Sequence, residues 1–389
     1  MTPFQRDRFT WLAYFMLAFY SYTQSTLGPL MPFLRAELHL DYATGALHVS
    51  AFALGVILAG SNADRVAGRW NRKITFWLGG AGMALGAVLL TLGRTPVFTI
   101  ASAFVMGYFG TYLLTMIQAA LADHHGSKRA IALTESNVAA SLSAVIAPLI
   151  VGLGTASVLG WRIALLAGAA AWVVMALIFR RTPVPEREHV VQQTAAPAVR
   201  RPLPRRFWIF WLVILFGVML EWSFSFWGAD FLHGSVGLDA SLASTLMSLF
   251  FLAMLVGRAA GSRLTHTTES SRLLIYAIGL VAVGFPLLWL AHIPVINILG
   301  LFIAGLGVAN LFPLTLAVVT SLVPEQSDVV SARVMQAAGA AVLIAPQVLG
   351  SLADRVGLYN AFGVIALILI AAAILIVAGS RAPVPAPAN

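Results

Sequence analysis

Long apolar runs make up most of this chain, and they constrain its fold more than any other feature. Twelve runs reach about 20 mainly apolar residues, the length that an α-helix needs to cross the hydrocarbon core of a bilayer. Six lie at residues 11–34, 42–61, 74–93, 97–121, 130–153 and 160–179. Six more lie at residues 207–232, 239–262, 273–292, 295–322, 329–352 and 358–379. Only 10% of the 389 residues are charged, whereas soluble domains carry about 25%. We therefore predict an all-α membrane protein with twelve transmembrane helices, and a water-soluble fold is excluded.

A polar connector separates the two sets of runs. It holds five prolines, seven arginines and two glutamates, a composition too polar and too broken by proline for a membrane helix. We predict an N-terminal six-helix half at residues 1–179, a cytoplasmic linker at 180–206 and a C-terminal six-helix half at 207–389.

The basic residues predict the orientation in the membrane. If the N-terminus is cytoplasmic, 20 of the 24 Lys and Arg residues fall in cytoplasmic segments and 4 in external ones. The positive-inside rule then places both termini in the cytoplasm, and we expect a multi-pass protein of the bacterial inner membrane. The basic residues lie in short loops rather than on one exposed face, so we expect no nucleic-acid partner.

The two halves repeat one sequence pattern. Ile-Ala-Pro-Leu-Ile-Val-Gly at 146–152 matches Ile-Ala-Pro-Gln-Val-Leu-Gly at 344–350, an offset of 198 residues. The same offset relates Phe104 and Gly107 to Phe302 and Gly305. We therefore predict two parallel six-helix repeats. Such repeats suit alternating access, in which two halves rock about a site between them.

With this duplication, the chain resembles the major facilitator superfamily over essentially its whole length. The family's loop between the second and third helices runs Gly-x-Leu-Ala-Asp-Arg-x-Gly-Arg-Arg/Lys. Residues 60–69 read Gly-Ser-Asn-Ala-Asp-Arg-Val-Ala-Gly-Arg and are followed by Arg72 and Lys73. Asn62 replaces the family's leucine, and one extra residue lies between Asp64 and Gly68. The resemblance implies a transporter that works by alternating access.

The motif also implies a gate. A carboxylate at the cytoplasmic mouth can face the positive N-terminal end of a helix in the other half. By the resemblance, the partner of Asp64 is the eleventh helix, which begins near Ser327. The predicted gating residues are Asp64, Arg65, Arg69 and Arg72. The alternative is that Asp64 is a helix-end residue neutralised by Arg65.

Two acidic residues, Glu221 and Glu135, fall inside the apolar runs. Glu221 lies about 21 Å along its helix, close to mid-membrane, and Glu135 about 8 Å from the cytoplasmic end of its own. An ionisable group at such depth costs about 2.5–3.5 kcal/mol, so a functional role is the default expectation. No Lys or Arg lies near mid-depth in any run. We therefore expect Glu221 to lack a counter-ion and to carry a proton, because desolvation favours the neutral carboxyl.

Each candidate proton carrier has an alternative interpretation. Glu221 could be a permanently protonated hydrogen-bond donor between helices, and Glu135 could cap a helix. His48 is the third candidate, although a hydrogen-bonded histidine between helices is the commoner case. Residues 220–227 also resemble the seventh helix of the fucose-permease-like branch of the superfamily, in which a Glu is followed by a Trp about six residues later.

Uncharged polar residues predict the wall of a binding cavity. In the fourth run, Tyr108, Thr111, Thr115 and Gln118 are spaced three, four and three residues apart, which places them on one helical face. The other predicted substrate-binding residues are Tyr20, Gln24, Trp222, Ser225, Trp227 and Asn310. Polar side chains also hold membrane helices together, so each residue has a structural alternative.

These residues favour import of a small, neutral and polar solute together with a proton. Anionic solutes would need fixed positive charge in the cavity, and the sequence shows none at mid-depth. Hydroxyl, amide and tyrosine groups suit a sugar-like molecule. The alternative is proton-driven efflux of apolar or cationic drugs, which aromatic and Met residues and a lone acid would suit. The expected partners are this small-molecule substrate, protons and the lipid bilayer, and we expect a monomer.

An enzyme is the competing class of protein. Cysteine is absent from the sequence, the eight histidines are scattered, and His124 and His125 lack the i, i+4 spacing of a two-histidine zinc site. We therefore expect no catalytic residues, no metal and no cofactor.

Overall fold

The computed structural model describes residues 4–186, 202–323 and 326–381, apart from the side chains of Asp64, Ser327, Asp328 and Arg381. Within these ranges the chain forms helices and turns and no strand. The helices before the linker are α1 (Arg8–Ser25), α2 (Met31–Leu38), α3 (Tyr42–Trp70), α4 (Arg72–Leu92), α5 (Pro96–His125), the 3-10 turn η1 (Gly126–Lys128), α6 (Arg129–Gly154) and α7 (Arg162–Phe179). Those after it are α8 (Arg205–Gly234), α9 (Ala240–Leu264), α10 (Ser270–Leu290), α11 (Pro294–Leu322), α12 (Ser327–Val356), α13 (Leu358–Ala361) and α14 (Gly363–Arg381).

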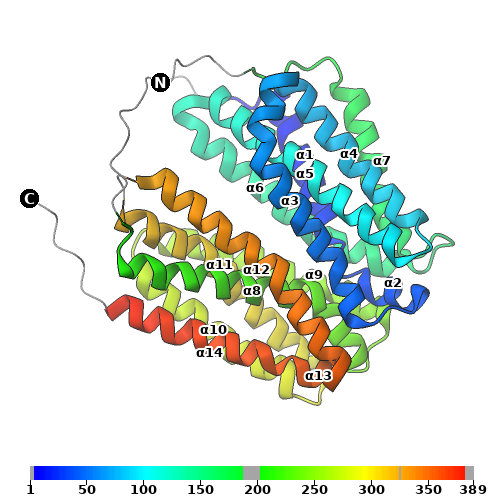
Figure 1. Ribbon diagram of the computed structural model, residues 1–389, viewed down its shortest axis with the longest axis vertical. Coiled ribbons are helices and arrows are strands. Elements are labelled where there is room, and N and C mark those ends of the chain that lie inside the picture. Colours follow the sequence, from blue (N-terminus) through cyan, green and yellow to red (C-terminus); the bar gives the residue numbers. More distant parts are fainter. Residues whose placement is uncertain (1–3, 187–201, 324–325, 382–389) are drawn as a thin grey trace, which may run out of the picture.

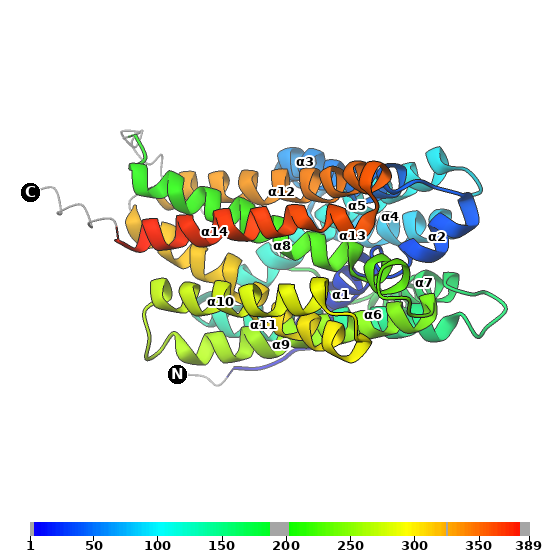
Figure 2. The ribbon, with the colours of Figure 1, turned by 90° about the horizontal axis from the view of Figure 1, so that it is seen from below.

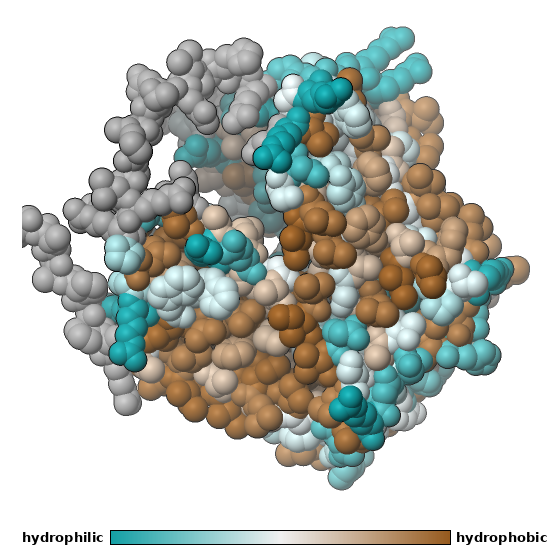
Figure 3. All heavy atoms as spheres, in the orientation of Figure 1, coloured by the Kyte–Doolittle hydropathy of each residue, from teal (hydrophilic) through white to brown (hydrophobic). Residues whose placement is uncertain are grey.

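The prediction of an all-α membrane protein is confirmed. Among the described residues, ten stretches are long and apolar enough to cross a membrane, and one of them, Pro96–Gly154, covers both α5 and α6. Figure 3 shows apolar residues over the flanks of the molecule, with hydrophilic residues gathered toward two ends. Leu177 and Leu367 expose 65% and 67% of their surface, as lipid-facing side chains do. The count of twelve crossings and the cytoplasmic termini stay predictions.

The helices form two groups that lie side by side, α1–α7 and α8–α14 (Figure 1). We call the end of the bundle at which α7 ends and α8 begins the linker end. The end that holds α2 and α13 is the far end (Figures 1 and 2). Across the boundary, α3 packs along α12 and α6 packs along α9.

The helix bounds follow the sequence duplication. A shift of 198 residues takes the bounds of α4 onto 270–290, which are the bounds of α10, and takes the start of α6 onto the start of α12. The same shift takes the start of α3 onto the start of α9. The α3–α12 and α6–α9 contacts are therefore equivalent under the duplication, and together they frame the space between the groups.

Two segments differ from the sequence-based expectation. The first run is not one helix, because α1 ends at Ser25 and α2 begins at Met31. A Cβ on Gly28, in the turn between them, would lie 2.1 Å from the carbonyl oxygen of Ser225, so a glycine is needed for this close approach. The motif at residues 60–69 is helical rather than a loop, because α3 continues to Trp70 and ends only at Asn71, where φ is 66°.

Candidate functional site

A cavity of about 230 Å³ lies between the two groups of helices. Its lining comes mainly from α1 and α6 on one side and from α8 and α9 on the other. Because a water molecule takes about 30 Å³ in the liquid, the cavity has room for roughly seven or eight waters or for one small organic molecule.

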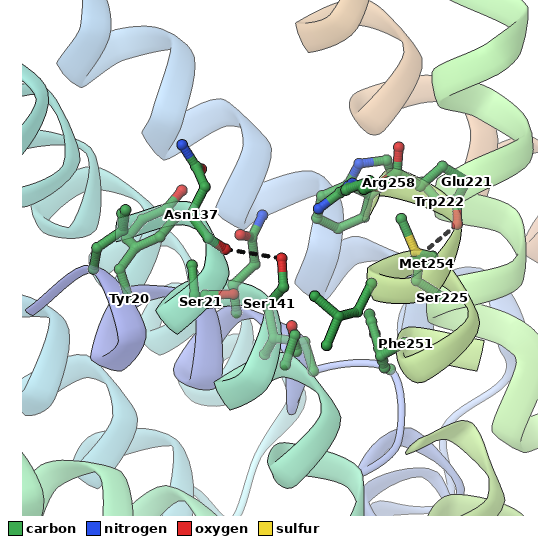
Figure 4. Close-up of a pocket in the computed structure, with 18 of the residues that line it drawn as sticks. Tyr20, Ser21, Asn137, Ser141, Glu221, Trp222, Ser225, Phe251, Met254 and Arg258 are labelled. Atoms are coloured by element: carbon green, nitrogen blue, oxygen red, sulfur yellow. Dashed lines mark hydrogen bonds and ion pairs between the residues drawn. The ribbon is translucent and has the colours of Figure 1, made fainter. Parts of the chain in front are cut away.

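Polar side chains form the wall that α1 and α6 contribute. Tyr20, Ser21 and Gln24 come from α1, and Asn137 and Ser141 come from α6. Figure 4 shows Tyr20, Ser21, Asn137 and Ser141 on one side of the cavity, facing the residues of α8 and α9. Of this wall, Tyr20 and Gln24 are predicted binding residues. Asn137 and Ser141 are not among the predicted residues, although their i, i+4 spacing in an apolar run is the same signal that points to Tyr20 and Gln24.

The opposite wall carries a charged pair. Glu221 of α8 and Arg258 of α9 both line the cavity, and Nη2 of Arg258 lies 3.5 Å from Oε1 of Glu221. The other acid–arginine pairs of the described residues are closer, at 3.0 Å or less. The side chain of Glu221 is 23% exposed and that of Arg258 is 46% exposed, so this pair is loose and open to the cavity.

Arg258 corrects the expectation that Glu221 lacks a counter-ion. The sequence places Arg258 near the linker end of its run, among the charges that are expected to be cytoplasmic. In the structure its long side chain reaches back to the level of Glu221 (Figure 4). Arg258 also supplies the cavity with the positive charge that an anionic solute needs, so anionic solutes are no longer disfavoured.

Apolar and aromatic groups complete the α8–α9 wall. Trp222, Phe226, Phe251 and Met254 line the cavity beside the charged pair. Ser225 also lines it, and its hydroxyl donates to the backbone carbonyl of Glu221 one turn earlier. Trp222 and Ser225 are therefore predicted binding residues that the structure places at the cavity.

The predicted residues of α5 do not line the cavity, and Tyr108 among them contacts α3 instead. These residues are Tyr108, Thr111, Thr115 and Gln118. The hydroxyl of Tyr108 lies 2.7 Å from that of Tyr112, and the amide of Asn62 on α3 joins both, 2.7 Å from Tyr112 and 3.3 Å from Tyr108. The hydroxyls of Thr111 and Thr115 donate to carbonyls of their own helix, and Gln118 is exposed.

Asn310 and Trp227, two other predicted binding residues, make contacts between helices. The Asn310 amide donates to the carbonyl of Gly257 at 2.8 Å, so it holds α11 against α9 one residue before Arg258. Trp227 is fully buried, and its indole N–H donates to the carbonyl of Pro346 on α12 at 3.1 Å.

The remaining two proton-coupling candidates lie apart from the cavity lining. His48 is fully buried between α3 and α5, where Nε2 lies 2.8 Å from the hydroxyl of Thr99. Glu135 forms a two-point ion pair with Arg6 at 2.6 and 2.8 Å, and Tyr14 donates to it at 3.0 Å. Paired N–H donors of this kind stabilise the charged carboxylate, so Glu135 is satisfied as an anion.

The predicted gating residues lie at the linker end. Arg65 and Arg69 are exposed on the last turns of α3, and the side chain of Asp64 lies outside the described part of the chain. Arg72 is buried instead. It pairs with Asp123 at 2.7 Å and donates to the carbonyl of Pro185 at 3.0 Å, so it fastens the start of α4 to the first residues of the linker.

Tight polar contacts join the two groups at the far end. Arg35 of α2 pairs with Asp230 of α8 at 2.6 Å, and its guanidinium carbon lies 3.5 Å from the centroid of the Tyr42 ring. Asp354 of α12 accepts from the backbone N–H groups of Tyr42 and Ala43, at 2.7 and 2.8 Å. These contacts leave no signal in the sequence, because each connects residues that lie at helix ends, where charges are expected for ordinary reasons.

A second set of far-end contacts lies along α9. Ser244 donates to the carbonyl of Pro29 at 2.7 Å, and Ser241 donates to the carbonyl of Gly152 at 2.8 Å. A Cβ on Gly152 would lie 2.5 Å from the carbonyl oxygen of Ser241, so α6 and α9 touch backbone to backbone here. In the part of the chain that the structure describes, these polar contacts between the groups lie on the far side of the cavity from the linker end.

Comparisons with known proteins agree with this architecture. The profile of the Major Facilitator Superfamily matches residues 11–332 and 229–389. An uncharacterized MFS-type transporter of Yersinia pestis is 25% identical over 353 residues, which cover 89% of each chain. The chain resembles a solved bacterial homologue of the human lysosomal transporter Spinster, in an inward-facing and occupied conformation, with a TM-score of 0.80, 15% identity and coverage of 99% and 100%.

Two further solved structures share the fold. The D-xylose–proton symporter has a TM-score of 0.78 at 11% identity, with 96% of this chain and 97% of that chain covered. The nucleoside transporter NupG has a TM-score of 0.74 at 15% identity, with 96% and 98% covered. The profile match spans nearly the whole chain and the fold agrees with it, so the chain belongs to the Major Facilitator Superfamily.

Proposed function

We propose that this protein is a proton-coupled secondary transporter that moves a small polar organic solute by alternating access through the central cavity. The observation that carries the proposal is the position of Glu221. This carboxyl lies in the cavity, opposite a wall of hydroxyl and amide groups, and among the described residues a single arginine, Arg258, pairs with it at 3.5 Å. A site that holds both a titratable acid and solute-binding groups can link the movement of a proton to that of a solute.

Tyr20, Gln24, Glu221, Trp222 and Ser225 are the predicted residues that we assign to this site. Hydroxyl and amide groups on α1 and α6 fix the orientation of a polar solute, and aromatic groups on α8 and α9 cover its apolar faces. We assign proton coupling to Glu221 rather than to Glu135 or His48, because those two lie outside the cavity lining with close partners of their own.

The far-end contacts support alternating access. With the linker end in the cytoplasm, closure at the far end corresponds to an inward-facing state of an inner-membrane protein. Opposite movement of the two groups would break the Arg35–Asp230 pair and the Asp354 contacts and would close the linker end.

Arg258 weighs against the alternative of drug efflux. A cationic drug would need the Glu221 carboxylate, which Arg258 already pairs with, and the arginine would repel the drug's own charge. The named solutes of the D-xylose–proton symporter and the nucleoside transporter are polar, which is consistent with the polar α1–α6 wall.

The test is solute-driven proton movement. The purified protein is reconstituted into vesicles that contain a pH-sensitive dye, without any imposed gradient, and a panel of polar solutes is added outside. Uptake of a coupled solute should acidify the lumen in vesicles that contain the protein and leave empty vesicles unchanged. Solute entry that leaves the internal pH constant would contradict proton coupling.

A further inference from the structure

We propose that the solute carries a carboxylate, which binds Arg258 in exchange for Glu221 once Glu221 has taken up a proton. This inference rests on the proposed function and specifies the substrate class. The two side chains line the same cavity, their charged atoms lie 3.5 Å apart, and both side chains stay partly exposed.

The geometry makes the two anions compete for one arginine. The Arg258 guanidinium presents five N–H donors, more than the single contact to Glu221 uses, and its planar fork suits a carboxylate. While Glu221 is ionised, a second carboxylate in the cavity would face an uncompensated like charge. When Glu221 is protonated, its charge no longer repels the solute, and Arg258 is free to bind it.

Among the described residues, no charged side chain other than Glu221 and Arg258 lines this cavity. The titratable side chains that line the cavity are Tyr20, Glu221 and Arg258. Helix α11, which is described over its full length and packs on α8, carries no charged residue. Arg333 of α12, which also packs on α8, hydrogen-bonds Gln336 at 2.9 Å. Arg35 at the far end of the bundle is paired with Asp230.

The charge balance of the site sets how many protons move with each solute carboxylate. The empty site holds one carboxylate and one guanidinium, so its net charge is zero. The loaded site holds a neutral Glu221, the guanidinium and the solute carboxylate, and its net charge is again zero. A site with the proton alone or the anion alone would carry unbalanced charge through the low-dielectric interior, which is costly. One proton therefore accompanies each carboxylate, and the transport is electroneutral.

The other residues that line the cavity indicate the chemistry of the rest of the solute. Tyr20, Ser21, Gln24, Asn137 and Ser141 offer hydroxyl and amide groups opposite the arginine. Trp222, Phe226 and Phe251 add flat apolar surfaces. A small hydroxylated or aromatic monocarboxylate fits these groups, and the corresponding neutral molecule lacks the partner for Arg258.

The experiment compares matched pairs of probes on the purified full-length protein. The pairs are gluconate with glucose and 4-hydroxybenzoate with 4-hydroxybenzamide, titrated at pH 5.5 and pH 8 by thermal shift. We expect a carboxylate to bind at least about tenfold more tightly than its neutral partner at pH 5.5, which corresponds to about 1.4 kcal/mol, and to weaken at pH 8. In Glu221→Gln, which mimics the protonated acid, the affinity should no longer depend on pH.

Three variants of α9 separate charge from structure. Arg258→Gln should abolish the preference for the carboxylate, and Arg258→Lys should keep part of it. Arg263→Gln removes an exposed arginine one to two turns away and should change nothing. In vesicles, uptake of the binding carboxylate should follow the pH gradient and should not respond to an imposed membrane potential.

Several results would overturn the proposal. These are equal or tighter binding of the neutral partners, carboxylate binding that survives in Arg258→Gln, uptake that responds to membrane potential, and a panel in which no carboxylate binds. A neutral partner whose uptake still follows the pH gradient would leave the proposed function standing while excluding the carboxylate. Uptake of a carboxylate without proton movement would instead contradict the proposed function.

Discussion

Arg35 and Asp230 join α2 to α8 through a 2.6 Å ion pair in which the arginine side chain is 15% exposed and the carboxylate only 4%. The pair crosses the boundary between the two groups of helices, and the ring of Tyr42 covers the guanidinium from the side. A buried pair of this kind costs much when it is broken on one side, because the remaining charge stays desolvated.

Removal of one partner of this ion pair should therefore lower stability more than removal of both partners. Arg35→Gln leaves the Asp230 carboxylate buried and unpaired, and we expect a loss of about 3–5 kcal/mol, seen as a large fall in the melting temperature in detergent. Arg35→Gln combined with Asp230→Asn should recover part of that loss, since no charge remains buried. Additive effects of the two substitutions would contradict the pairing.

The Asp354 contacts predict a second effect, on conformation. Asp354 of α12 accepts hydrogen bonds from the first two backbone N–H groups of α3. Asp41, which belongs to the same group of helices as α3, accepts one from the third backbone N–H group, that of Thr44. Asp354→Asn should weaken this contact by about 1 kcal/mol, because the amide keeps one acceptor oxygen and its nitrogen cannot accept from the second N–H group. Far-end closure should weaken with it, because Asp354 belongs to the other group.

Spin labels at introduced cysteines can measure this change. Thr95 and Asn360 are exposed at the far end, one in each group, and the natural chain has no cysteine. In Asp354→Asn the distances between these labels should shift to larger values. Asp41→Ala is the control, since it removes the cap of the same helix without touching the other group. Equal distributions in both variants would show that the Asp354 contact does not hold the far end closed.

Glu37 lies on α2 at the far end of the bundle, and its contacts predict a pH dependence of stability. Partial burial disfavours its charge, but hydrogen bonds from Arg162 and Trp161 and the charges of Arg162 and Arg94 outweigh that effect, so its pKa lies below the usual value. A carboxyl whose pKa is lowered by folding stabilises the folded state above its unfolded pKa, about 4.3, and loses this contribution as the pH falls through its folded pKa.

Comparison with Glu37→Gln isolates this effect. The difference in melting temperature between the two proteins should be constant from about pH 7 down to pH 5, and it should shrink as the pH falls below the ordinary pKa of a glutamate. A difference that stays constant down to pH 3 would show that the charge of Glu37 contributes nothing.

Cysteines introduced next to the two ends of α6 test the orientation of the protein in the membrane. Ser127 is exposed just before α6 at the linker end, and Val158 is exposed just after it at the far end. In intact cells, a cysteine at Val158 should react with an impermeant maleimide, while one at Ser127 should react only after permeabilisation. The reverse pattern would invert the orientation, and reaction of both from one side would remove the predicted crossing.

The helices could be predicted closely from the sequence, because a 20-residue apolar run admits few alternatives in a bilayer. The cavity could be predicted only in part. Tyr20, Gln24 and Glu221 stood out as polar residues within an apolar run. The polar face of α5 gave the same signal, but the Tyr108 hydroxyl is hydrogen-bonded to Asn62 of α3 and to Tyr112 of its own helix.

The pairs that define the site depend on tertiary register. Glu221 meets Arg258 only because α8 and α9 pack antiparallel with these two turns at one level, and the arginine's long side chain reaches the cavity. Arg35 meets Asp230 across the boundary of the two groups, 195 residues apart in sequence. Such contacts leave no local pattern in the sequence, and charges near helix ends have ordinary explanations.

The central claim is that Glu221 couples the movement of a proton to that of the solute. Its most direct measurement uses vesicles and a solute found by the dye assay, with exchange and gradient-driven uptake measured in Glu221→Gln and in Glu135→Gln. Glu221→Gln should retain exchange and lose uphill uptake under an imposed pH step, because glutamine can hold a hydrogen bond but cannot release a proton. Glu135→Gln, whose carboxylate pairs with Arg6 outside the cavity lining, should retain both. Uphill uptake that persists in Glu221→Gln would contradict the claim.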